Sequence, residues 1–113
     1  MDLYLKNKVA FVTGGSRGMG KAIAMRLARA GAKTAICARG RSSLNEALSQ
    51  LRQISSDVLG IPADISRSPE IESCVRQIKD QWGGIDILIN NAGIYQQNAL
   101  TEITPSMWDA QFN

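Results

Sequence analysis

The chain has 113 residues, a formal net charge of +3 and no histidine, and 44% of its residues are hydrophobic. This composition excludes an intrinsically disordered chain, and the length supports one small domain with a buried core. The basic residues are scattered and no apolar run is long enough to cross a bilayer, so we expect no nucleic-acid or membrane partner. Because the first residues lack a signal-peptide core, Cys37 and Cys74 are expected to be free buried thiols in a cytoplasmic protein.

A glycine-rich turn follows the first expected strand. Residues 13–20 read Thr-Gly-Gly-Ser-Arg-Gly-Met-Gly, and residues 21–30 then carry apolar side chains at helical spacing. Gly14 would allow a sharp turn out of the strand, Gly18 a close approach to a pyrophosphate, and Gly20 tight packing of the helix. Free N–H groups at the start of that helix would bind the anionic pyrophosphate. A strand, turn and helix in this order predict a dinucleotide site rather than a structural loop.

Apolar strands and amphipathic helices alternate along the rest of the chain. We expect strands at residues 9–13, 34–38, 57–63 and 85–90. After the helix at residues 21–30, the second helix is expected to be capped by Ser42 or Ser43. The third is expected to be capped by Ser68, with Pro69 at its first position, and to end at Gly83-Gly84, and the fourth to begin at Thr104-Pro105. Right-handed crossovers then require a doubly wound α/β fold, with a parallel sheet covered by helices on both faces.

At these motifs the chain resembles the N-terminal part of a short-chain dehydrogenase/reductase. The matching motifs are residues 13–20, Ala63-Asp64-Ile65 after the third strand, Asn90-Asn91-Ala92-Gly93 after the fourth, and Trp108-Asp109. The resemblance implies an incomplete Rossmann-type sheet with strand order 3-2-1-4, in which Asp64 lies near the adenine. The cofactor-binding residues that it implies are Gly14, Ser16, Arg17, Gly18, Met19, Gly20, Arg39, Asp64, Ile65, Asn91, Ala92 and Gly93.

The end of the second strand bears on which nicotinamide cofactor is bound. A site for NAD(H) places a carboxylate about 20 residues past the glycines, to bind the ribose hydroxyls. This chain has Ala38 at that position, and Arg39 follows it. The guanidinium groups of Arg39 and Arg17 present fork-like donors that suit a 2′-phosphate, and Arg41 stays open as a substitute for Arg39. The sequence therefore favours NADP(H), with NAD(H) as the alternative.

The 113 residues do not contain the catalytic residues that the resemblance implies. The family uses a serine, a Tyr-x-x-x-Lys pair and an asparagine. The one such spacing here, Tyr4 and Lys8, comes before the first expected strand and not in the family's catalytic segment, Tyr95 begins no such pair, and the asparagine position falls just past Asn113. We expect residues 1–113 to be a fragment, the N-terminal part of a single NAD(P)-binding domain.

The full-length parent is then expected to be a homo-oligomeric oxidoreductase. It would transfer hydride between the nicotinamide and a small carbonyl or alcohol substrate, such as a 3-oxoacyl thioester or a small ketone. A stand-alone dinucleotide-binding or partner-binding module without catalysis is the alternative.

Overall fold

The fold is an alternation of strands and helices, seen in a computed structural model that describes residues 5–91 of the chain. Its elements are β1 (Val9–Thr13), α1 (Gly18–Arg29), β2 (Lys33–Ala38), α2 (Arg41–Arg52), β3 (Val58–Pro62), α3 (Ser68–Trp82) and β4 (Ile87–Asn90). The strands form one parallel sheet in the order β3-β2-β1-β4. The predicted α/β fold and strand order are thus confirmed.

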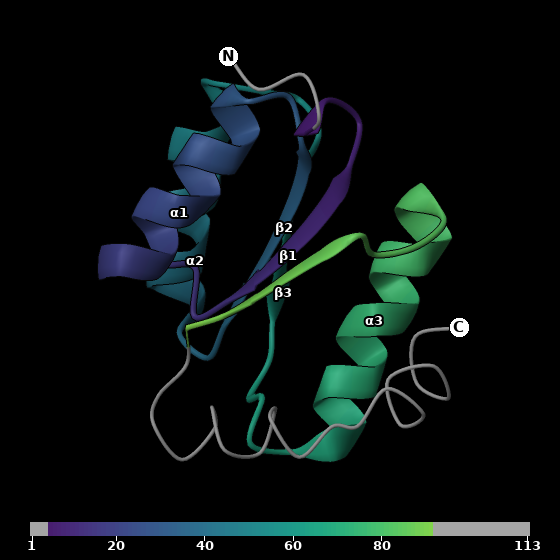
Figure 1. Cartoon of the computed structure of the whole chain (residues 1–113). Coiled ribbons are helices and arrows are strands. Elements are labelled where there is room, and N and C mark those ends of the chain that lie inside the picture. The colour runs from purple at the N-terminus through teal and green to yellow at the C-terminus, as the bar shows by residue number, and fades with distance from the viewer. Residues whose placement is uncertain (1–4, 92–113) are drawn as a thin grey trace.

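Helices cover both faces of this sheet, with α1 and α2 on one side and α3 on the other (Figure 1). Val12 and Ile36 pack with the apolar side chains of α1 and α2, while Phe11 and Cys37 belong to the core that includes α3. Every side chain of β1 is therefore buried. This burial on both faces explains why the central strands read as continuous apolar runs rather than as alternating ones.

The register of the strands brings their carboxyl ends to one edge of the sheet. Thr13 pairs with Cys37 of β2 on one side and with Asn90 of β4 on the other, and Ala38 pairs with Pro62 of β3. Because all pairs are parallel, the segments that follow the four strands open at the same edge. The glycine turn and the motifs after β2, β3 and β4 therefore meet there.

The first two helices begin differently from the sequence prediction. α1 begins at Gly18 rather than at residue 21, so the end of the glycine turn is already helical. α2 has Gly40 as its N-cap, and the predicted caps Ser42 and Ser43 lie inside its first turn, so that prediction is wrong. The reason is that the Ser43 hydroxyl donates to the Gly40 carbonyl oxygen at 3.2 Å instead of accepting from a backbone N–H.

The third helix follows the prediction at its end but not at its start. Arg67 is the N-cap, so Ser68 is the first helical residue rather than the cap. Gly83 ends α3 in the left-handed conformation, with φ of 90°, which confirms the predicted C-terminus. The helix expected from Thr104 lies outside the described residues.

β4 lies at an edge of the described sheet. Its pairing with β1 is extended at one end by Asp86, whose N–H donates to the Val9 carbonyl and whose carboxylate accepts from the Val9 N–H, both at 2.8 Å. The side chains of Ile87–Asn90 are half-buried. Among residues 5–91, no strand pairs with the other side of β4. An apolar edge of this kind is a template for pairing with another chain.

We expect the 113-residue chain to self-associate as its concentration rises, because backbone groups along β4 can pair with a second copy. Size-exclusion chromatography with light scattering across a concentration series should give a mass that climbs above the 12.3 kDa of one chain. A sharp monomer peak at every concentration, with a cooperative thermal transition, would contradict this expectation.

Candidate functional site

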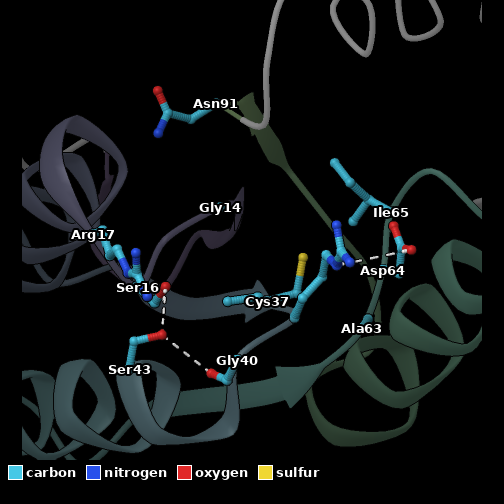
Figure 2. Close-up of a pocket in the computed structure, with 12 residues that line it drawn as sticks. Gly14, Ser16, Arg17, Cys37, Gly40, Ser43, Ala63, Asp64, Ile65 and Asn91 are labelled. Atoms are coloured by element: carbon cyan, nitrogen blue, oxygen red, sulfur yellow. Dashed lines mark hydrogen bonds and ion pairs between the residues drawn. The ribbon is translucent and has the colours of Figure 1, made fainter.

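A cavity of about 430 Å³ opens where the strand ends converge. Its walls come from the glycine turn after β1, the β2–α2 connection, the loop after β3 and the residue after β4 (Figure 2). The lining residues are Gly14, Ser16, Arg17, Cys37, Ala38, Arg39, Gly40, Ser43, Ala63, Asp64, Ile65 and Asn91. Segments far apart in the sequence share this cavity because the parallel register places all of them at one edge of the sheet.

The cavity brings together most of the residues that the sequence predicted for the site. Those that line it are Gly14, Ser16, Arg17, Arg39, Asp64, Ile65 and Asn91. The remaining described residues lie beside it on α1: Gly18 lines a neighbouring hollow of about 410 Å³, Met19 is 71% exposed, and Gly20 packs against the turn. Ala92 and Gly93 lie outside the described residues.

Sequence reasoning did not select several of the lining residues, of which Ser43 and Gly40 carry polar groups from the start of α2. Because Ser43 has the residue type of a helix cap, it is not among the site residues predicted from the sequence. Its position in the first turn of the helix that follows Arg39 was the signal that could have identified it. Cys37 and Ala63 enter the lining because they lie at strand ends, where the floor of the cavity is formed.

The glycine turn leaves the N-terminus of α1 open to a ligand. Gly14 and Gly18 have φ of 64° and 54°, values that side chains with a Cβ rarely adopt. No atom lies within 4 Å of the position that a Cβ on Gly18 would take, so the space beside it is free among the described residues. The N-cap residue Arg17 makes no side-chain cap hydrogen bond. The first N–H groups of α1 therefore lack a side-chain acceptor and suit an anion.

Thr13 fastens the glycine turn to the end of β4. Its hydroxyl accepts from the Asn91 backbone N–H at 3.0 Å and donates to Asn90 Oδ1 at 3.1 Å. A Cβ added to Gly20 would clash with the Gly14 carbonyl oxygen and lie 2.5 Å from Asn91 Nδ2. The turn, the first turn of α1 and the residue after β4 are thus in direct contact, and only glycine fits at position 20.

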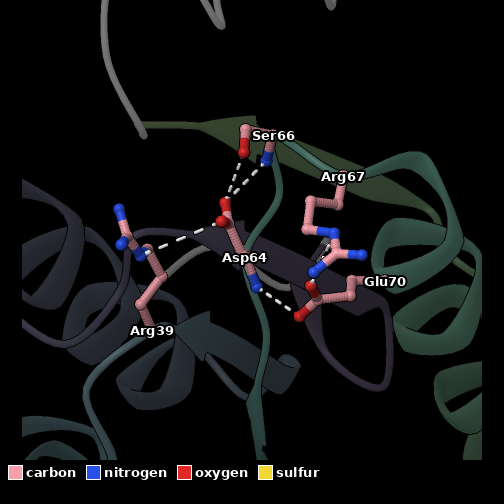
Figure 3. A network of polar contacts seen from close by, with 5 residues as sticks. All are labelled: Arg39, Asp64, Ser66, Arg67 and Glu70. Atoms are coloured by element: carbon pink, nitrogen blue, oxygen red, sulfur yellow. Dashed lines mark hydrogen bonds and ion pairs between the residues drawn. The ribbon is translucent and has the colours of Figure 1, made fainter.

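A polar network holds the loop after β3 (Figure 3). The Asp64 carboxylate accepts from the Ser66 hydroxyl at 2.6 Å and from the Ser66 backbone N–H at 3.0 Å. The Asp64 N–H donates to Glu70 Oε1 at 2.7 Å, and Glu70 Oε2 lies 3.6 Å from Arg67 Nε. The Ser66 hydrogen bonds, with smaller contributions from Arg39 and Arg67, hold the pKa of Asp64 below its usual value. Asp64 is therefore ionised at neutral pH.

Two arginines place positive charge on the cavity walls. Arg17 lies at the α1 side (Figure 2), while Arg39 lies at the β3 side, with its Nε 4.0 Å from Asp64 Oδ2. The Arg39 side chain is 81% exposed, so this ion pair contributes little to stability and leaves the guanidinium able to turn toward a ligand. Arg41, the alternative partner, does not line the cavity. The geometry therefore favours Arg39 over Arg41.

Within residues 5–91, neither the two buried cysteines nor a metal-binding cluster provides a second candidate site. Cys37 and Cys74 are buried and free, and the hydrogen bond between their thiols, together with burial, raises the pKa of Cys37, which stays a neutral thiol. In this part of the chain no cluster of three or more histidine, cysteine or acidic residues could hold a metal ion. None of its helices combines the length and apolar character needed to cross a membrane.

Comparisons with known proteins identify relatives. A family described as short chain dehydrogenase matches residues 8–113. The chain is 34% identical to a 3-oxoacyl-[acyl-carrier-protein] reductase of Staphylococcus epidermidis, over 91% of the chain and 43% of that protein. It resembles L-sorbose reductase from Gluconobacter frateurii, solved with NADPH and L-sorbose, with 37% identity and a TM-score of 0.78, over 83% of the chain and 36% of that protein. It also resembles an NAD+-bound xylitol dehydrogenase, with 30% identity and a TM-score of 0.76, over 80% of the chain and 35% of that protein.

The length of these relatives limits what the likeness covers. The chain spans less than half the length of the curated relatives that it matches. Residues 8–113, which the family matches, contain the whole described sheet and the cavity at its edge.

Replacing Gly20 with alanine tests the contact among the turn, α1 and Asn91. We expect Gly20→Ala to lower the free energy of unfolding by about 1–3 kcal/mol, because the new methyl group must displace the Gly14 carbonyl or the Asn91 amide. Urea denaturation followed by circular dichroism measures this. Gly84→Ala is the matched control, since no atom lies within 4 Å of a Cβ there. Equal effects of the two substitutions would show that the close contact at Gly20 is absent.

Proposed function

The chain belongs to the short-chain dehydrogenase family of NAD(P)-dependent oxidoreductases, and on that premise we propose that its edge cavity binds the adenine half of NADP(H). The observation that carries the proposal is the placement of Arg17 and Arg39 on separate walls of one cavity, with Ala38 where an NAD(H) site would have its carboxylate. Guanidinium groups in that position suit the 2′-phosphate that distinguishes NADP(H).

Each wall of the cavity has a part in this proposal. The uncapped N-terminus of α1 and the open space at Gly18 suit the pyrophosphate. The loop at Asp64 and Ile65, held by Ser66 and Glu70, would contact the adenine. Arg17 and Arg39 would pair with the 2′-phosphate. The nicotinamide of the bound cofactor would supply the hydride for a reversible carbonyl reduction, and the described residues of this chain would bind the adenine half and the pyrophosphate of that cofactor.

The preference for NADP(H) over NAD(H) follows from charge. A 2′-phosphate brings negative charge close to Asp64, which is ionised, so a cationic residue must offset the repulsion. Arg39 lines the cavity beside Asp64, with its Nε 4.0 Å from Oδ2 of that carboxylate. An alanine at position 38 leaves room for the phosphate and adds no repulsion. NAD(H), which lacks that phosphate, would gain nothing from either arginine.

In the complete enzyme, segments beyond these 113 residues would bind the substrate and carry the catalytic serine, tyrosine and lysine. We propose a small carbonyl or alcohol substrate, a class that includes a 3-oxoacyl thioester or a sugar, and a homo-oligomeric enzyme. Residues 1–113 would then be the N-terminal part of a single domain. The free, buried Cys37 and Cys74 support a cytoplasmic location, where thiols stay reduced.

Substituting Arg39 tests the cofactor preference. We expect Arg39→Ala to weaken NADP(H) binding by about 1.5–3 kcal/mol, because one charge-assisted phosphate contact is lost, while NAD(H) binding hardly changes. Titration calorimetry with both cofactors measures this. Arg41→Ala removes the same charge from a position outside the cavity and should leave the ratio of the two affinities unchanged. Equal weakening toward both cofactors in Arg39→Ala would show that Arg39 does not read the 2′-phosphate.

We also expect the 113-residue chain to have no reductase or dehydrogenase activity, because the one Tyr-x-x-x-Lys spacing in it, Tyr4 and Lys8, precedes β1, whereas the cavity is formed after the strands, so no such pair follows them to donate the proton. An assay with NADPH and a panel of ketones should show no turnover above buffer. Protein-dependent NADPH oxidation that disappears in Gly18→Asp would overturn this expectation, since that change closes the pyrophosphate position.

A further inference from the structure

Two serine hydroxyls lie next to each other on one wall of the cavity. Ser16 lies in the glycine turn and Ser43 in the first turn of α2, and their Oγ atoms are 3.4 Å apart (Figure 2). Ser43 Oγ also lies 3.2 Å from the Gly40 carbonyl oxygen. Both Ser42 and Ser43 line the neighbouring hollow of about 410 Å³, but only Ser43, which is half-buried, also lines the cavity, whereas Ser42 is exposed. The turn after β1 and the start of α2 therefore contribute one hydroxyl each to the same spot.

The two serine hydroxyls have one hydrogen each, and at least one of these hydrogens can be donated to a ligand. A serine hydroxyl carries a single hydrogen and accepts through two lone pairs. Ser43 therefore cannot donate to the Ser16 oxygen and to the Gly40 carbonyl at the same time. If Ser43 donates to Gly40, the Ser16 hydrogen can turn either to Ser43 or into the cavity. If Ser43 turns toward a ligand, only a weak contact near the helix start is lost, so each hydroxyl can rotate to meet an acceptor.

The surroundings of this pair favour an anion. Ser16 precedes Arg17 in the chain, and Ser43 shares its wall with Gly40, which follows Arg39. The hollow beside the pair is lined by Arg17 and Lys21, with Glu46 as its acidic member. Gly40 has no side chain to cap α2, so the first N–H groups of that helix also lack a side-chain acceptor. Donors therefore gather here from two backbone segments and two hydroxyls.

We propose that Ser43 is a specificity-determining residue, whose hydroxyl binds the 2′-phosphate of NADP(H) together with Ser16. This inference rests on the proposed NADP(H) function, and adds neutral donors to the charges of Arg17 and Arg39. The arginines are long, exposed side chains, so their guanidinium groups must be ordered when the phosphate binds. The serine hydroxyls are held close to the backbone of the turn and of α2, so they fix where the phosphate oxygens lie.

The test uses two probes that differ only in the group concerned, adenosine 2′,5′-bisphosphate and 5′-AMP. Titration calorimetry of the 113-residue chain compares Ser43→Ala with the matched control Ser42→Ala. We expect Ser43→Ala to weaken the bisphosphate roughly tenfold, because a hydrogen bond to a charged acceptor is lost. Binding of 5′-AMP should be unchanged. Ser42→Ala, which removes an exposed hydroxyl that lines only the neighbouring hollow, should weaken the bisphosphate much less than Ser43→Ala does.

A second pair of variants tests the same site by charge. Ser43→Asp keeps a residue that suits the first turn of a helix, but its carboxylate would repel the 2′-phosphate. We expect it to abolish the preference for the bisphosphate, and Ser42→Asp to reduce that preference much less. Circular dichroism of each variant confirms that α2 is intact.

The outcomes separate this inference from the proposed function. If the wild-type chain prefers the bisphosphate and Ser43→Ala keeps that preference in full, Ser43 does not contact the 2′-phosphate, while the NADP(H) proposal stands. If the wild-type chain binds both probes equally or binds neither, both proposals fail. If Ser42→Ala and Ser43→Ala weaken the bisphosphate equally, the effect belongs to the helix start and the inference about Ser43 is wrong.

Discussion

Coverage of both faces of the parallel sheet is the constraint on which the rest of this structure depends. Helices α1 and α2 cover one face and α3 the other, so the strand side chains are committed to the core. Polar and charged groups can then gather only at an edge, among the segments that follow the strands. The parallel register makes the carboxyl edge the place where four such segments meet. The position of the site therefore follows from the way in which the helices cover both faces of the sheet.

That same constraint explains which features could be predicted from the sequence. The apolar runs and helical spacing were enough to predict a parallel sheet with helices on both faces, because few topologies satisfy right-handed crossovers. The order of the strands was predicted from the family resemblance. Gly14 turns the chain with a positive φ and Gly20 packs tightly against that turn, in line with the roles expected from the sequence, while the role of Gly18 beside a pyrophosphate stays a prediction. Local sequence rules were sufficient wherever the determining interaction is itself local.

The errors concern positions where a tertiary contact competes with a local rule. Ser43 has the residue type of a helix cap, but its hydroxyl faces Ser16 and the Gly40 carbonyl, and Gly40 is the cap. The choice between Arg39 and Arg41 could not be made from spacing, because it depends on where the strand ends and the helix begins. The helix begins at Arg41, and Arg39 lines the cavity whereas Arg41 does not.

The contact of Gly20 with the turn and with Asn91 has a thermodynamic consequence. The N-terminus of α1 and the end of β4 share one tightly packed point, tied by the Thr13 hydroxyl. A ligand that orders the turn at its pyrophosphate position would therefore also order the residue that follows β4. By reciprocity, if phosphate at the turn changes the affinity of a group that binds next to Asn91, that group changes the affinity of the turn for phosphate by the same factor. Two regions far apart in the sequence would then be energetically coupled without any moving hinge between them.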